Sequence, residues 1–99
     1  MVRHMGVSFD WSTEKNQQRI EQRWISFESV VSAIEEGGLV DVLGHPNQDR
    51  HPGQRIYVVK VGEHVCVVPF VVQADGTRFL KTIIPSRKAT RAYPRRQPS

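Results

Sequence analysis

The chain has 99 residues, of which 38% are hydrophobic, and its formal net charge is +4. This length supports one compact core and excludes two domains with separate interiors. No run approaches the roughly 20 apolar residues of a membrane-spanning helix, and residues 1–7 lack the apolar core of a secretory signal, so the sequence predicts a cytoplasmic protein. The single cysteine, Cys66, excludes an intrachain disulfide and a cysteine zinc cluster.

Positive charge is concentrated at the end of the sequence. Residues 77–99 carry seven Lys and Arg and no Asp or Glu, whereas the earlier part carries seven basic and ten acidic residues. Such a segment attracts phosphates, which favours nucleic acid or an acidic protein as the partner. The alternative is a solvated tail that only keeps the protein soluble.

The first third of the chain predicts one strand and two helices. Residues 7–11 alternate apolar and polar side chains, as in a short strand, and Ser12 or Thr13 can cap a weakly amphipathic surface helix over residues 13–23. A second helix begins after the N-cap Ser26 and ends at Gly37-Gly38. Its buried face is predicted from the spacing i, i+3, i+4 and i+7 of Phe27, Val30, Val31 and Ile34. Trp24, like Phe27, is assigned to core packing.

The remainder predicts a loop followed by a meander of strands. Residues 39–43 are compatible with a strand, a turn of helix or a packed linker, and the two prolines and two glycines of residues 44–54 predict a surface loop. Three runs rich in β-branched residues follow, at 55–61, 64–73 and 77–84, separated by Gly62-Glu63 and Asp75-Gly76. Pro69 predicts a bulge or an edge in the middle run.

The predicted fold is therefore α+β. A small antiparallel sheet carries two N-terminal helices on one face, in the order β-α-α-β-β-β. A short basic helix is expected over residues 86–93, capped by Ser86 and stopped by Pro94. We expect a single domain over residues 1–93 and a disordered basic tail over 94–99.

Several catalytic signatures are missing from the sequence. It has no glycine-rich phosphate loop, dinucleotide fingerprint, nucleophile elbow or His-Glu-x-x-His motif, so no cofactor is expected. His45, Asp49 and His51 invite a metal interpretation, but no third His or Cys has the usual ligand spacing, and we expect no metal.

The strongest catalytic hypothesis joins the loop to the last strand and its exit. RNA is cleaved without a metal when a base takes the 2′-hydroxyl proton, cations stabilise the phosphorane and an acid protonates the leaving oxygen. His45, Lys81 and Arg87 are the candidates for these roles, with Arg87 as a bidentate phosphate clamp. The plainer alternatives are a solvated charge for Lys81 and a turn residue packed on Pro46 for His45.

Further residues are candidates for holding RNA. Arg55, Lys88 and Arg91 supply positive charge, and the ring of Trp11 can stack on a base. Core packing is an equally good explanation of Trp11.

Two stretches resemble a known family. Residues 9–16, Phe-Asp-Trp-Ser-Thr-Glu-Lys-Asn, followed ten residues later by Ser26-Phe27-Glu28, and the ending Ile-Pro-Ser-Arg-Lys-Ala-Thr-Arg over residues 84–91, are similar to the BrnT family of type II toxins. The resemblance covers roughly residues 8 to 93. Ser12, Arg23-Trp24 and Pro85-Ser86 depart from the family pattern, where Asp, His-Gly and Ser-Ala are usual.

The resemblance implies a RelE-like fold and a metal-independent endoribonuclease that cleaves mRNA and blocks translation. It also implies neutralisation by a small DNA-binding antitoxin in a hetero-oligomer. By position, Trp11 corresponds to the family tryptophan and Arg87 to the arginine of the final motif.

Two other functional classes are compatible with the sequence. A non-catalytic module would use the same basic surface to bind nucleic acid or an acidic partner in a regulatory complex. A structural interaction protein would instead offer an exposed sheet edge to a partner strand.

Overall fold

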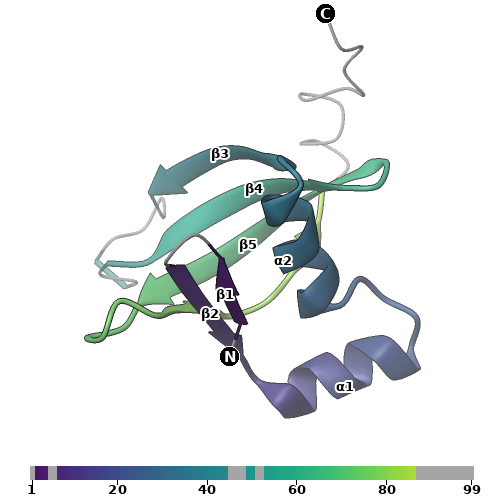
Figure 1. Cartoon of the computed structure of the whole chain (residues 1–99), viewed down its shortest axis with the longest axis horizontal. Helices are drawn as coiled ribbons and strands as arrows, with labels where there is room; N and C mark the ends of the chain where they lie inside the picture. The colour runs from purple at the N-terminus through teal and green to yellow at the C-terminus, as the bar shows by residue number, and fades with distance from the viewer. Residues whose placement is uncertain (1, 5–6, 45–48, 51–52, 87–99) are drawn as a thin grey trace, which may run out of the picture.

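The computed structural model describes residues 2–4, 7–44, 49–50 and 53–86. It confirms the α+β class; α2 lies against the sheet, whereas α1 stands to one side of it (Figure 1). The helices are α1 (Thr13–Glu21) and α2 (Phe27–Glu35). The strands are β1 (Val2–His4), β2 (Val7–Trp11), β3 (Leu39–Gly44), β4 (Arg55–Val61), β5 (His64–Val72), β6 (Arg78–Leu80) and β7 (Ile84–Pro85).

The sheet is mixed, so the expectation of a purely antiparallel sheet is wrong. Its strand order is β1-β2-β6-β5-β4-β3, and β7 pairs with β5 beside β6. The predicted meander of β4, β5 and β6 is confirmed as antiparallel, with Gly62 and Gly76 at positive φ in its two turns. However, β2 pairs with β6 in parallel. Parallel neighbours require a long crossover, which both helices and the meander together provide.

Two segments differ from what their local pattern predicts. The undecided stretch at 39–43 is strand β3, which pairs with β4 alone among the described strands and has all six residues exposed at the sheet edge. The run at 77–84 is not one strand, because β6 ends at Leu80 and β7 begins at Ile84.

Pro69 forms neither a bulge nor an edge. It stays in register with Ile56 of β4, and its carbonyl accepts a hydrogen bond of 2.8 Å from the Lys81 backbone N–H. The N and C=O of a strand residue point to the same side, so the missing donor of Pro69 faces the interruption between β6 and β7. The proline is thus accommodated by breaking the neighbouring strand rather than its own.

The helix boundaries follow from their caps. The side chains of Ser12 and Ser26 accept hydrogen bonds from the backbone N–H groups of Lys15 and Ser29, which confirms both predicted starts. The stop of α2 is confirmed by Gly37 at φ 92°. Helix α1 ends at Glu21, two residues earlier than predicted, because Arg23 has a left-handed backbone with φ 59°.

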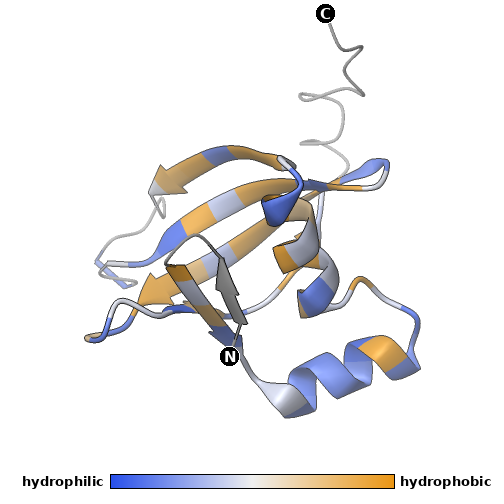
Figure 2. Ribbon diagram, in the orientation of Figure 1, coloured by the Kyte–Doolittle hydropathy of each residue, from blue (hydrophilic) through white to orange (hydrophobic). Residues whose placement is uncertain are grey.

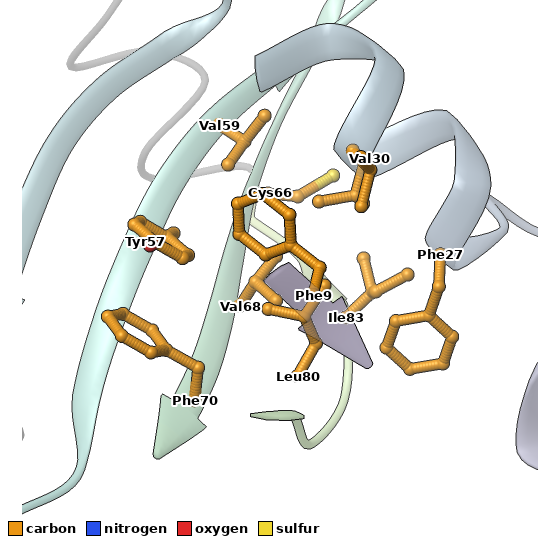
Figure 3. Packing of buried hydrophobic residues seen from close by; sticks show 11 residues of the cluster. Phe9, Phe27, Val30, Tyr57, Val59, Cys66, Val68, Phe70, Leu80 and Ile83 are labelled. Atoms are coloured by element: carbon orange, nitrogen blue, oxygen red, sulfur yellow. The ribbon is translucent and has the colours of Figure 1, made fainter. Parts of the chain in front are cut away.

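Most of the core lies between α2 and the sheet (Figure 3). As Figure 2 shows, the ribbon of α1 is mostly hydrophilic, whereas the central strands are rich in hydrophobic positions. Phe27, Val30 and Val31 of α2 are buried, as predicted, and Ile34 is half-buried. Helix α1 is held mainly by polar contacts, to α2 and to residues 81–83. The packing role expected for Trp24 is wrong, since 58% of its surface is exposed.

The helix expected over residues 86–93 lies outside the described residues except for Ser86, and so does the tail at 94–99. No helix in the described part of the chain is long and apolar enough to cross a membrane.

Candidate functional site

Two arginines face a cleft on the surface of the sheet that carries α2. We call it the arginine cleft; its volume is about 270 Å³ and it is lined by Leu39, Val42, Arg55, Tyr57, Phe70, Val72 and Arg78. These residues come from four strands, β3 to β6.

Strand register explains why these side chains share one face. Arg55 is opposite Phe70, and Arg78 is opposite Val72, in antiparallel pairs whose side chains point to the same side. Tyr57 is two residues beyond Arg55 on β4 and therefore lies on that face as well. The two arginines flank β5 and are offset by two residues along it, so their Cα atoms stand roughly 12 Å apart. Because arginine side chains are long, their two guanidinium groups can approach one anion from both sides.

Aromatic rings form the floor of the cleft. The rings of Tyr57 and Phe70 are stacked with centroids 4.0 Å apart and planes within 10°. In Figure 3 this pair lies at the end of the core cluster that is farthest from α2. Both residues are only 2% exposed, so the floor is rigid and apolar.

Arg78 is held in place by Tyr57 but is only partly satisfied. Its Nη1 donates to the Tyr57 hydroxyl at 2.8 Å, while its Nε is buried and has no hydrogen-bond partner in the described structure. A buried donor of a charged group without a partner costs about 1 to 3 kcal/mol.

The electrostatics of the cleft favour an anion. The side chain of Arg55 is exposed and makes no hydrogen bond or ion pair with the described residues, and no described carboxylate lines the cleft. Two guanidinium groups over an apolar floor therefore suit a phosphate group, which guanidinium binds through paired N–H donors.

Of the predicted site residues that the structure describes, only Arg55 lines this cleft. Lys81 follows the end of β6 and is not part of a strand, although it falls within the run 77–84 that predicted one. Its carbonyl accepts a hydrogen bond of 2.8 Å from Nζ of Lys15, which places Lys81 beside α1. Its side chain is exposed, as in the plainer interpretation.

Trp11 has a packing role in the structure. It ends β2, is half-buried, and stacks on Phe27 with ring centroids 5.9 Å apart and planes within 9°. It does not line the arginine cleft. The other predicted site residues lie outside the described residues: His45, Arg87, Lys88 and Arg91.

Tyr57 and Arg78 were not among the predicted site residues. A signal existed for Tyr57, which is two residues from Arg55 in a predicted strand. For Arg78 the turn signal was misleading, because a two-residue Asp75-Gly76 loop would pair Arg78 with Gln73, whereas the loop of residues 74–76 pairs it with Val72. The hydrogen bond between Tyr57 and Arg78 had no such signal, because it joins strands that are not neighbours.

Within the described part of the chain, no group of three or more His, Cys, Asp or Glu side chains is placed to hold a metal ion.

Comparison of the chain with models of protein families, with curated proteins and with solved structures finds no match in any of the three.

Proposed function

We propose that the chain binds RNA, with a phosphodiester held in the arginine cleft between Arg55 and Arg78, and cleaves it without a metal ion. The observation that carries the proposal is the pair of guanidinium groups, those of Arg55 and Arg78, that line one cleft with no described carboxylate beside them. The similarity of the sequence to the BrnT toxins supports RNA as the nucleic acid and a small DNA-binding antitoxin as the protein partner.

The proposed reaction is an internal transesterification. The 2′-oxygen attacks the adjacent phosphorus, the bond to the 5′-oxygen breaks, and the products are a 2′,3′-cyclic phosphate and a 5′-hydroxyl. Negative charge grows on the phosphorane, where Arg55 and Arg78 would stabilise it more strongly than they stabilise the starting phosphodiester. Preorganised cations of this kind act in the transition state without needing to rearrange.

Tyr57 is the candidate proton carrier of the cleft. Its hydroxyl accepts from Arg78 and keeps its own proton for donation, and no other described lining residue has an O–H group. In the proposal this proton passes to the leaving 5′-oxygen. His45 and Arg87, which lie outside the described residues, remain candidates for the base that takes the 2′-hydroxyl proton and for a further phosphate contact.

Purified protein and a labelled single-stranded RNA in EDTA test the proposal directly. Arg55→Ala and Arg78→Ala should weaken binding and slow cleavage, whereas Tyr57→Phe should preserve most of the binding and slow cleavage by about 10²-fold or more. Lys60→Ala is the matched control, because it removes one positive charge from the opposite face of β4. If Arg55→Ala, Arg78→Ala and Tyr57→Phe all cleave RNA as fast as the wild type and Lys60→Ala, the assignment of the cleft is overturned.

A second function, RNA binding without cleavage, is favoured by one observation. The described lining of the arginine cleft contains no imidazole or carboxylate group that could act as general base. This candidate predicts binding that Arg55→Ala and Arg78→Ala weaken, together with intact RNA at every protein concentration. Formation of a 2′,3′-cyclic phosphate by the wild-type protein would exclude it.

A further inference from the structure

A second cleft lies at the opposite end of β5 and contains the exposed Trp24. We call it the tryptophan cleft; its volume is about 410 Å³. Its apolar wall consists of Trp24, Ile25, Ile83 and Pro85, and its polar groups are Arg19, Arg23 and His64. No described carboxylate lines it. Arg23 and Trp24 stand at one of the positions where the sequence departs from the BrnT pattern, and neither has a role in the arginine cleft.

Trp24 is held in its exposed position. Its backbone N–H donates to the Arg19 carbonyl at 2.8 Å, directly after Arg23 with its left-handed backbone. The Arg19 guanidinium lies 5.9 Å from the centre of the Trp24 ring, in cation–π contact. Trp24 is 58% exposed as a residue, so its fixed ring offers a surface for another planar group.

The charge of Arg19 in this cleft is not neutralised by a carboxylate. The guanidinium donates to the Ile83 carbonyl at 2.6 Å, the Ile25 carbonyl at 3.3 Å and the Thr82 hydroxyl at 3.4 Å. It also lies 5.7 Å from the centre of the Phe27 ring. These partners fix the group without cancelling its charge, and burial lowers the pKa of Arg19 because it disfavours the charged form. An anion in the cleft would stabilise that form.

Arg23 is a second, uncommitted cation at the same place. Its side chain is exposed and makes no hydrogen bond or ion pair with the described residues. The cleft therefore joins a fixed aromatic surface to free positive charge. Its volume is near the lower end of the roughly 300 to 1,000 Å³ of small-molecule pockets, which suits a ligand larger than one side chain.

We propose that the tryptophan cleft binds a nucleotide, with the base stacked on Trp24 and the phosphate held by Arg23. The ligand is either a free mononucleotide or one nucleotide of a single-stranded RNA. The site depends neither on cleavage nor on the arginine cleft. An acidic peptide with an aromatic side chain has a related chemistry and serves as the competing probe in the test.

Tryptophan fluorescence separates the two tryptophans of the chain. In Trp11→Phe, which leaves Trp24 as the only tryptophan, addition of AMP, GMP, CMP or UMP at low salt should quench the emission to saturation. Affinity measured by calorimetry should fall about tenfold or more in Trp24→Ala, the range expected for loss of one base stack. It should also fall in Arg23→Ala. Ile20→Ala is the matched control, because Ile20 is 48% exposed but does not line the cleft.

The outcomes distinguish this site from the proposed function. Arg78→Ala should leave mononucleotide quenching unchanged even if it abolishes RNA binding in the arginine cleft. Tighter binding of a short oligonucleotide than of any mononucleotide, lost in Trp24→Ala, would identify the RNA strand as the source of the nucleotide; equal affinities would identify the free nucleotide. Absence of quenching in Trp11→Phe, unchanged affinity in Trp24→Ala, or a tighter fit for an Asp-Phe-Asp peptide would overturn the proposal.

Discussion

The hydroxyl of Tyr57 on β4 accepts a hydrogen bond of 2.8 Å from Nη1 of Arg78 on β6, across the strand β5 that separates them. Ladder hydrogen bonds connect only adjacent strands, so this side-chain bond ties together two strands that are otherwise linked through β5. It also fixes the direction of a guanidinium in the arginine cleft. Fold stability and the proposed site therefore share one contact.

A double-mutant cycle should detect this contact. Tyr57→Phe keeps the stacking on Phe70 and removes the acceptor, and Arg78→Ala removes the donor. Because a hydrogen bond to a charged group contributes more than a neutral one, we expect a coupling free energy of about 1.5 kcal/mol from urea unfolding of the two single variants and the double variant. Effects of the two substitutions that simply add would contradict a direct bond.

The salt dependence of RNA binding should report Arg55. If Arg55 contacts one phosphate, Arg55→Ala should reduce the slope of log K against log salt by about 0.7, the value for one contact to a single strand. Fluorescence anisotropy with a labelled oligonucleotide at several salt concentrations measures the slope. An unchanged slope in Arg55→Ala, or an equal reduction in Lys60→Ala on the opposite face, would count against a phosphate contact at Arg55.

Local sequence signals predicted the elements whose causes are local. The start of α2 at Ser26, its buried Phe27 and its end at Gly37 each depend on neighbouring residues, and all three were correct. The two turns of the meander belong to the same class. The prediction that Trp24 packs in the core was wrong, because burial of a residue between two helices depends on how the following chain packs.

Long-range pairing could not be read from the sequence. The parallel alignment of β2 with β6 joins Phe9 to Arg78, and no short-range pattern encodes such a contact. The division of the run at 77–84 likewise depends on another strand, because the carbonyl of Pro69 on β5 accepts from the Lys81 backbone N–H where the run is interrupted. Arg55 was predicted from its charge alone, whereas the cleft around it required the register of four strands.

Two adjacent glycines should respond differently to substitution by alanine. Gly37 has φ 92° and open space around its Cα, so Gly37→Ala should cost about 1 kcal/mol from backbone strain. A Cβ on Gly38 would stand 2.6 Å from the Lys60 carbonyl oxygen and 2.9 Å from that of Ala33. Because both are backbone atoms, β3 would have to shift, and we expect about 2 to 3 kcal/mol for Gly38→Ala.

Urea unfolding of the two variants gives the comparison. Gly62→Ala is the matched control for strain alone, since Gly62 has φ 63° and nothing within 4 Å of an added Cβ. A cost for Gly38→Ala no larger than that of the other two would argue against the close approach of Gly38 to Ala33 of α2 and Lys60 of β4.

Asn16 should be the main polar link between the two helices. It is 5% exposed, its Oδ1 accepts from the Phe27 backbone N–H at 2.8 Å, and its Nδ2 donates to Glu28 at 2.8 Å. Asn16→Ala leaves the buried N–H of Phe27 without a partner, so the free energy of unfolding should fall by about 2 to 3 kcal/mol.

A second substitution, Asn16→Asp, tests the contact between residue 16 and Glu28. Asn16→Asp keeps the acceptor for Phe27 but places a carboxylate against Glu28, so it should also destabilise the protein at neutral pH. Adding Glu28→Gln restores a donor opposite the new carboxylate and should recover most of the loss in a urea titration. If Glu28→Gln gives no recovery, the contact between residues 16 and 28 does not contribute as described.

The turn between β5 and β6 should make stability depend on acid pH through Asp75. Its Oδ1 accepts from the Thr77 backbone N–H at 2.9 Å, and this bond lowers the pKa of the carboxyl group below its ordinary value of 3.8. A carboxyl group whose pKa is lower in the folded state stabilises the fold above the ordinary pKa, and that contribution is lost as the pH falls through the folded-state value.

Asp75→Asn removes the titration but keeps an oxygen acceptor. Wild type should therefore be more stable than Asp75→Asn near neutral pH, and the difference should shrink as the pH falls below about 4, where the unfolded chain protonates first. Thermal unfolding of both proteins across this range measures the difference, in which the other carboxyl groups cancel. A constant difference at every pH would mean that the carboxylate of Asp75 is not what closes the turn.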